Sequence, residues 1–325
     1  MSRSVVLMFS GQGSQYYHMG RQLFKTHPVF QEWMLKLNDI ASDLIGESLL
    51  DILYDDSKRS SERFDRTLYT HPSIFMMEYS LAQVLLESGI EPDYVMGASL
   101  GEFTAAAVSA VMSVEELLEL LVKQARLLEA CCEKGGMLAI LHDINLYYDT
   151  PALYENSELA SVNYNSHSVV SGKRERLQKT EAFMRDNDIV YQDLPVSHAF
   201  HSSLIDSAAA QYKKLLGDRQ YQFPQIRFVS CLSGTILTSL PCHFFWNVIR
   251  EPIQFIKAVH ELEDGQKKIY IDLGPSGTLA NFIKYNLKQD SASESHAIIT
   301  PFGQEAKQLA KIQQLFKKCG KGIEK

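Results

Sequence analysis

The chain has 325 residues, of which 45% are hydrophobic, so it can bury the core of one large domain or of one large and one small domain. Its formal net charge of -7, with Lys and Arg spread along the chain, argues against a nucleic acid as partner. No apolar run approaches the ~20 residues that cross a bilayer, and the five cysteines show no CxxC or Cys/His ligand spacing. We expect a globular cytoplasmic protein with reduced thiols that binds neither a metal nor a membrane.

Short apolar runs alternate with longer helical patterns over the first part of the chain. The predicted strands are residues 5–9 and 94–96, and the predicted helices are residues 28–45, 72–88, 101–110 and 114–132. This alternation predicts an α/β fold with a mainly parallel sheet.

The pattern changes from Met137 onward. The segments "GGMLAIL", "LASVNYNSHSVVSG", "KRERLQKTEAFMRDND" and "IVYQDLPV" are predicted as strand, strand, helix and strand, which suits a small α+β module inserted into the larger domain. A helix resumes after His201, and the strand "KKIYIDLG" precedes the helix "PSGTLANFIKYNL". The last ~20 residues are expected to form a surface helix and a frayed tail.

Ser99 lies in a sequence pattern that is typical of a nucleophilic serine. Ser99 lies in "GASLGE", a G-x-S-x-G sequence that follows the predicted strand "YVMG" and precedes the small-residue helix "GEFTAAAVSAV". The small residues Gly97, Ala98 and Gly101 allow a tight strand-to-helix turn, and the helix N-terminus stabilises negative charge. The alternative is a glycine-bounded loop between two core elements. The context favours Ser99 as a nucleophile.

A serine hydroxyl needs a base within hydrogen-bond reach. Among ten histidines, His198 and His201 in "LPVSHAFHSSLI" lie where the inserted module returns to the large domain, next to an expected cleft. A lone histidine is more often a surface or capping residue, so its position in the sequence makes His201 only a candidate for the base.

Four motifs taken together are more specific. "FSGQGSQ", "GASLGE", "HAFHS" and "DLGPSGTLANF", in this order, closely resemble malonyl-CoA:acyl carrier protein transacylases and polyketide synthase acyltransferase domains. The resemblance spans roughly residues 5–300. It looks most like the freestanding, trans-acting acyltransferase-type enzymes, acyl hydrolases among them, of bacterial polyketide synthase clusters. We therefore expect an α/β-hydrolase-like domain of residues 1–133 and 199–325 with a ferredoxin-like α+β subdomain of residues 134–198.

The resemblance implies roles for particular residues. Ser99 would take the acyl group from a thioester, and His201 would act as the general base. The backbone N–H groups of Gln12 and Leu100 would form the oxyanion hole. No cofactor is implied, because the substrate carries phosphopantetheine as acyl carrier protein or CoA. The expected partners are an acyl carrier protein and an acyl thioester, and we expect a monomer.

In the family a main-chain carbonyl, and not a carboxylate, orients the catalytic histidine. The corresponding stretch of this chain is "FFWNVIREP". Asn247 and Val248 both remain candidates for that carbonyl.

The acyl pocket departs from the family pattern at two positions. Ala98 replaces the usual histidine before the nucleophile, and Gln124 occupies the position where malonyl-transferring relatives carry an arginine that pairs with the malonate carboxylate. Arg126 should not substitute for that arginine, because two residues along a helix turn it roughly 200° away. Losing the charged contact should cost on the order of 3–5 kcal/mol of malonyl preference.

The "HAFH" sequence of His198 to His201 gives the opposite indication. In polyketide acyltransferases it accompanies malonyl selection, with Phe200 narrowing the space beside the α-carbon. We give the missing charge more weight, because it changes selectivity by more than an apolar wall does. The leading hypothesis is hydrolysis of non-malonyl acyl groups from acyl carrier protein, a proofreading activity. The alternatives are malonyl or other acyl transfer to carrier protein and, more remotely, a non-catalytic module that binds carrier protein.

Overall fold

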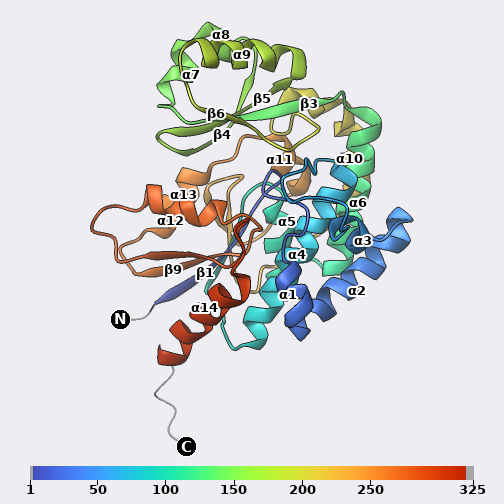
Figure 1. Ribbon diagram of the computed structural model, residues 1–325, viewed down its shortest axis with the longest axis vertical. Coiled ribbons are helices and arrows are strands. Elements are labelled where there is room, and N and C mark those ends of the chain that lie inside the picture. The colour runs from blue at the N-terminus through green and yellow to red at the C-terminus, as the bar shows by residue number, and fades with distance from the viewer. Residues whose placement is uncertain (1–2, 320–325) are drawn as a thin grey trace, which may run out of the picture.

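The computed structural model describes residues 3–319, which form two β-sheets flanked by helices (Figure 1). The larger sheet has six strands in the order β10-β9-β1-β2-β7-β8, and every neighbouring pair is parallel except β7 with β8. Its strands are β1 Ser4–Phe9, β2 Tyr94–Gly97, β7 Arg227–Ser230, β8 Thr235–Leu237, β9 Lys268–Asp272 and β10 Glu294–Ala297. The α/β fold with a mainly parallel sheet is confirmed.

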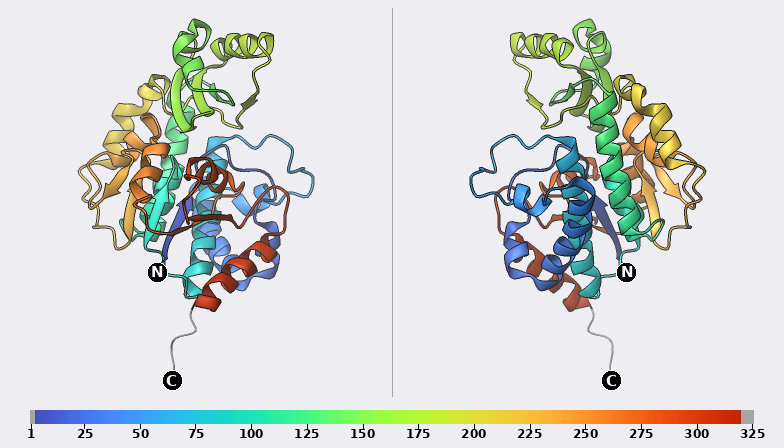
Figure 2. Two further views of the ribbon diagram at one scale, coloured as in Figure 1. Left: turned by 90° about the vertical axis from the view of Figure 1, so that its left-hand side faces the viewer. Right: turned by 90° about the vertical axis from the view of Figure 1, so that its right-hand side faces the viewer.

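The central strand β1 explains how this sheet is buried. In its sequence SVVLMF, the residues after Ser4 form an unbroken, buried apolar run, as expected of a parallel strand covered on both faces. Because side chains alternate along a strand, Leu7 and Phe9 enter one apolar cluster, whereas Val6 and Met8 enter another. Helices α2 (Pro28–Ile45) and α4 (Thr67–Glu87) pack into the first cluster, and helices α12 (Phe255–Leu262) and α13 (Thr278–Asn286) pack into the second. In Figure 2 the blue helices and the orange α12 and α13 accordingly lie on opposite sides of the strands.

The helices of the large domain fall into an early and a late group. The early ones are α1 Arg21–Thr26, α2 Pro28–Ile45, α3 Leu49–Leu53, α4 Thr67–Glu87, α5 Gly101–Val108 and α6 Val114–Cys131. The late ones are the 3₁₀ helix η1 Ser203–Ala208, α10 Ala209–Leu216, α11 Phe244–Arg250, α12 Phe255–Leu262, α13 Thr278–Asn286 and α14 Glu305–Cys319. The predicted C-terminal helix is confirmed as α14, while residues 320–325 of the expected tail lie outside the described residues.

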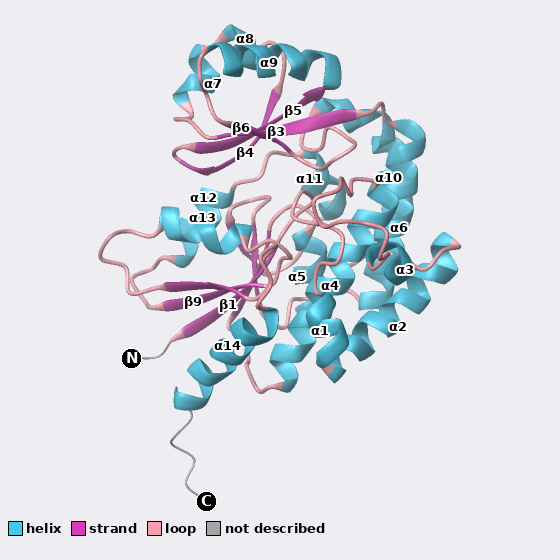
Figure 3. Cartoon of the chain, in the orientation of Figure 1, coloured by secondary structure: helices cyan, strands magenta, loops and turns pink. Residues whose placement is uncertain are grey.

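The second sheet is small and antiparallel, in the order β4-β5-β3-β6. Its elements, all within residues 134–198, are β3 Gly135–Ile140, β4 Glu158–Tyr164, β5 His167–Lys173 and β6 Tyr191–Asp193, with α7 Asn145–Asp149, α8 Pro151–Tyr154 and α9 Arg174–Asp186. The segment "LASVNYNSHSVVSG", expected to be one strand, is two, because the turn-forming residues Asn165 and Ser166 reverse the chain. Figure 3 shows loops gathered between the two sheets.

Helix α4 begins at Thr67, five residues before its predicted start at Pro72. Proline favours a first turn, which made Pro72 a natural start, but here it lies inside the helix. The residues before it, Thr67, Thr70 and His71 among them, are buried against the rest of the fold, and this packing outweighs local preference. The extra turn carries His71 to the functional site described below.

Among the described helices, none combines the length and the apolar character that crossing a bilayer requires.

Candidate active site

Ser99 lies on a sharp turn between strand β2 and helix α5. Its backbone φ of 54° is left-handed, a conformation that a side chain adopts only under strain. The neighbouring glycines are required sterically, since a Cβ on Gly97 would lie 2.4 Å from Glu102 Cα and one on Gly101 would lie 2.0 Å from the Phe9 carbonyl oxygen. The predicted tight turn with small flanking residues is therefore confirmed.

His201 meets Ser99 across the fold, 102 residues further along the chain. Its Nε2 lies 2.7 Å from Ser99 Oγ, and its Nδ1 lies 2.7 Å from the Glu251 carbonyl oxygen. Because a carbonyl only accepts hydrogen bonds, Nδ1 carries the proton, and in the neutral ring Nε2 is left to accept from the serine hydroxyl. The arrangement is that of a nucleophile beside its base.

The carbonyl that orients His201 belongs to neither predicted residue. Asn247 and Val248 lie inside α11, and the Asn247 carbonyl already accepts the N–H of Glu251. The last carbonyls of a helix have no partner within it, so they are free to accept from other groups. Glu251, just past the end of α11, uses its carbonyl for the ring, and Ile249 uses its own for the His201 backbone N–H at 2.9 Å.

Burial sets the protonation state of His201. The ring is almost fully removed from water, and desolvation lowers its pKa to about 4 although the Glu251 hydrogen bond favours the charged form. His201 is therefore neutral at pH 7 and able to accept a proton.

This pKa predicts the pH dependence of activity. The value of kcat/KM should be flat from about pH 6 to 8 and should fall only as the pH approaches 4, where the ring of the free enzyme becomes protonated. A rate profile with a stable acyl thioester measures this directly. An acid limb near 6.5, the ordinary value for histidine, would show instead that water reaches the ring in solution.

The loop after β1 packs directly against Ser99. A Cβ on Gly11 would lie 2.9 Å from Ser99 Cβ, so only glycine permits this approach. Within residues 3–319, the backbone N–H groups of Gln12 and Leu100 have no hydrogen-bond acceptor, and both residues line the cavity at Ser99. They are the donors that the sequence predicts for an oxyanion hole.

Helix α4 anchors this loop through a carboxyl group that the sequence did not single out. The backbone N–H and hydroxyl of Ser10 both donate to Glu78 Oε1, at 2.6 and 2.9 Å, and Thr104 donates to Glu78 Oε2 at 3.0 Å. Burial raises the pKa of Glu78 to about 8. No sequence motif indicated Glu78, because it reaches the loop after β1 only through the packing of α4 against the end of that strand.

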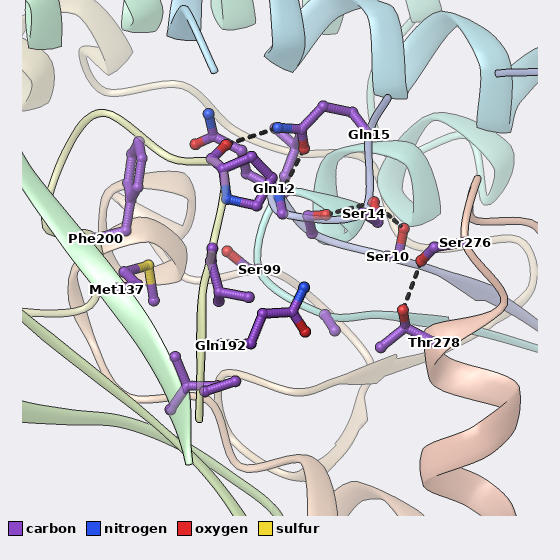
Figure 4. A pocket seen from close by; sticks show the side chains of 18 of the residues that line it. Ser10, Gln12, Ser14, Gln15, Ser99, Met137, Gln192, Phe200, Ser276 and Thr278 are labelled. Atoms are coloured by element: carbon purple, nitrogen blue, oxygen red, sulfur yellow. Dashed lines mark hydrogen bonds between the residues drawn. The ribbon is translucent and has the colours of Figure 1, made fainter. Parts of the chain in front are cut away.

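The cavity beside Ser99 has a volume of about 580 Å³ and lies between the two sheets. Met137, Ala139 and Val169 of the small sheet form part of its wall, together with Phe200. In the view of Figure 4, Phe200 and Met137 lie to one side of Ser99 and Ser276 and Thr278 to the other.

Of the four predicted acyl-pocket residues, Ala98 and Phe200 line this cavity. Gln124 does not, because it is fully buried behind His71, a cavity residue that the sequence did not nominate. His198 is also absent from the wall, since it is buried with its Nδ1 3.1 Å from Thr67 Oγ1 at the start of α4. The expectation that Gln124 and His198 line the pocket is therefore wrong.

Positive charge is scarce in the cavity. Arg63 is the one lysine or arginine among the described lining residues, and it pairs with Asp65 at 2.5 Å and Asp193 at 2.8 Å. Desolvation lowers the pKa of His71 to about 3, so this ring is neutral at pH 7. Arg126 points away, donating to the Leu44 carbonyl at 2.6 Å.

Comparison with known proteins bears on this site. The family model described as acyl transferase domain matches residues 6–320. The chain is 48% identical to "Polyketide biosynthesis acyltransferase homolog PksD" of Bacillus subtilis, over 96% of this chain and 97% of that protein. It is 36% identical to "Polyketide biosynthesis protein ThaF" of Burkholderia thailandensis, over 95% of this chain and 27% of that protein.

Solved structures share the fold. A loading acyltransferase of the avermectin modular polyketide synthase superposes with a TM-score of 0.86 at 22% identity, covering 96% of this chain and all of that one. The structure titled MCAT from Streptococcus pneumoniae gives a TM-score of 0.77 at 21% identity, over 96% of this chain and 100% of that one. The two-sheet architecture is thus that of acyltransferases.

Proposed function

Since this chain belongs to the acyl transferase domain family, we propose that it removes acyl groups without a free carboxylate from acyl carrier protein in polyketide biosynthesis, by way of an ester on Ser99 that water hydrolyses. Its relationship to the polyketide acyltransferase homologues makes it an acyl-transferring enzyme. The finer assignment, hydrolysis of an uncharged acyl group, comes from the site.

Acylation uses the geometry of Ser99 and His201. Ser99 Oγ attacks the thioester carbonyl carbon while His201 Nε2, at 2.7 Å, takes the hydroxyl proton. The negative oxygen that forms accepts hydrogen bonds from the N–H groups of Gln12 and Leu100. The carbon–sulfur bond then breaks, and the proton passes from Nε2 to the sulfur, which leaves as the free thiol of phosphopantetheine.

Deacylation repeats these steps with water. His201 Nε2 takes a proton from the attacking water, the same two N–H groups stabilise the second negative oxygen, and the ester bond to Ser99 breaks. The proton returns to Oγ, which restores the serine and releases the free acid. The chemistry needs no cofactor of the protein's own, because the substrate carries phosphopantetheine. The carrier protein is the proposed partner, and the monomeric state stays a prediction.

One observation carries the preference for uncharged acyl groups. Gln124 is hydrogen-bonded to His71 and Tyr212 and does not reach the cavity, so nothing at this position can pair with a carboxylate. Within the described part of the chain the cavity wall holds one guanidinium, that of Arg63, and it already pairs with two aspartates. A malonyl carboxylate placed beside neutral His71 and Phe200 would lose its hydration without gaining a counter-charge.

Malonyl transfer remains the second candidate because of Phe200. Its ring lies 5.4 Å from that of His71 and narrows the cavity where an α-substituent would stand, which suits an unbranched acyl group. Acetyl and malonyl groups both lack a branch at the α-carbon, so the narrow cavity admits either. The position of Phe200 therefore does not oppose hydrolysis of an acetyl group. The remote alternative, a non-catalytic carrier-binding module, leaves the 2.7 Å contact of Ser99 with His201 without a purpose.

The test offers the enzyme two possible acyl acceptors, the thiol of an unloaded carrier protein and water. Catalytic amounts are mixed with acetyl-loaded carrier protein and a second, unloaded carrier of different mass, and in a parallel reaction with unloaded carrier and malonyl-CoA. Intact-mass spectrometry should show that the first carrier loses its acetyl group while the second gains none, and that no malonyl carrier forms. Acetyl on the second carrier would identify a transferase, and malonyl on the carrier would show that the missing arginine does not set selectivity.

A further inference from the structure

A buried chain of hydrogen bonds leads from α10 to the loop that contacts Ser99. Tyr212 Oη lies 2.6 Å from Gln124 Oε1, and Gln124 Nε2 lies 3.2 Å from His71 Nδ1. His71 Nε2 lies 2.9 Å from Gln12 Oε1, and Gln12 Nε2 lies 2.9 Å from Thr70 Oγ1. Tyr212, Gln124, His71 and Thr70 are almost completely buried, so water does not compete for these groups.

With the two glutamine amides oriented as they are in the structure, the hydrogen bonds run in one direction, from Tyr212 to Thr70. The Tyr212 hydroxyl donates to Gln124 Oε1, which turns Gln124 Nε2, a donor, toward His71. Nδ1 of the neutral His71 ring must then accept, so the ring carries its proton on Nε2. That proton is donated to Gln12 Oε1, and Gln12 Nε2 donates in turn to Thr70. Each of these four hydrogen bonds therefore joins one donor to one acceptor.

The hydrogen-bond chain reaches the side chain of Gln12, whose backbone N–H faces the cavity at Ser99. Gln12 supplies one of the two proposed oxyanion N–H groups, and its side chain is held by His71 and Thr70 of α4. The other hold on the loop is Glu78, seven residues after His71 and hence on the same face of α4. The loop is therefore fixed at Ser10 by a carboxyl group and at Gln12 by the chain from Tyr212.

We propose that Gln124 and Tyr212 are positioning residues, which fix the proton of His71 on Nε2 and thereby hold the Gln12 backbone N–H in place over Ser99. This inference rests on the part of the proposed function in which that N–H stabilises the oxyanion. Position 124 thus carries a role of its own in this chain.

The kinetic test compares Tyr212→Phe, Gln124→Met and the double variant with the wild type. Single-turnover thiol release should show Ser99 acylation slowed about 10- to 100-fold at saturating acetyl carrier, with KM within about twofold, since the displaced N–H acts on the transition state. The double variant should be no slower than Gln124→Met alone, because both substitutions break one chain. Unchanged acylation in folded variants, or multiplicative effects, would overturn the proposal.

Tyr270→Phe is the matched control. Tyr270 lies on strand β9 and is another fully buried tyrosine, and its hydroxyl donates a 2.7 Å hydrogen bond to Glu263. The acylation rate of this variant should equal that of the wild type. A loss as large as that of Tyr212→Phe would mean that general loosening of the fold explains both variants, and the positioning role would be rejected.

A spectroscopic arm separates this proposal from the proposed function. In protein labelled with ¹⁵N-histidine, NMR should find the His71 proton on Nε2, and in Gln124→Glu on Nδ1, because a carboxylate accepts from both Tyr212 and the ring. A wild-type His71 protonated on Nδ1 would overturn the inferred direction. If the wild type never acylates Ser99, yet His71 carries its proton on Nε2 in the wild type and on Nδ1 in Gln124→Glu, the proposed function is refuted and the hydrogen-bond chain is retained.

Discussion

Ser99→Ala is expected to lower the rate of acyl release from carrier protein by about 10⁴-fold or more, because without Oγ no ester can form and only the oxyanion N–H groups remain. The fold should be unaffected, since alanine adopts the backbone conformation of residue 99 at a cost similar to that of serine. Acyl loss is followed by intact mass of the carrier, and thermal unfolding is followed by circular dichroism.

The control for this substitution is Ser109→Ala. Ser109 is a buried serine at the C-terminal end of α5, the helix that follows Ser99, and its hydroxyl donates only to carbonyls of α5. Activity within about twofold of the wild type is expected, because the residue touches no reacting group. If Ser99→Ala retained a tenth of the wild-type rate, the acyl group would not pass through this hydroxyl, and the proposed mechanism would be wrong.

Gly101→Ala is expected to be the most destabilising single methyl group that can be added near the site. The new Cβ would stand 2.0 Å from the Phe9 carbonyl oxygen and 2.4 Å from its carbon, so α5 and β1 would have to separate. We expect a loss of about 3–5 kcal/mol in the free energy of unfolding, above the usual range for overpacking because backbone has to move. Urea unfolding of the purified variant measures it.

Gly136→Ala offers the matched comparison on strand β3. There the added Cβ meets the end of the flexible Arg174 side chain at 2.8 Å, which can move aside. A loss of about 1 kcal/mol or less is expected. Equal stability of the Gly101→Ala and wild-type proteins would show that the turn is looser in solution than its geometry indicates.

The turn that exposes the proposed nucleophile, Ser99, could be predicted from sequence because its geometry is local. The turn at Ser99 depends on residues within two positions, and their small size is visible in the sequence itself. The strand β1 could likewise be predicted, since an unbroken apolar run of this length between polar segments indicates a buried parallel strand.

The partners of the site depend on packing, and the sequence did not reveal them. The carbonyl that holds His201 is that of Glu251 because α11 ends at Arg250, and helix ends are the least certain part of a prediction. Gln124 lies on the buried face of α6. It does not reach the cavity because His71 lies between Gln124 and the cavity. The sequence did not reveal this, because α4, which carries His71, starts five residues earlier than predicted.

The central claim is that Ser99 carries the acyl group and that water removes it. The most direct measurement is intact mass and peptide mapping of the enzyme, quenched at intervals after mixing with excess acetyl-loaded carrier or with malonyl-loaded carrier, in the absence of a second thiol. We predict an acetyl ester on Ser99 that forms and then decays as acetate accumulates, with no malonyl ester. A lasting malonyl ester on Ser99, or acetyl attached to another residue, would contradict the account.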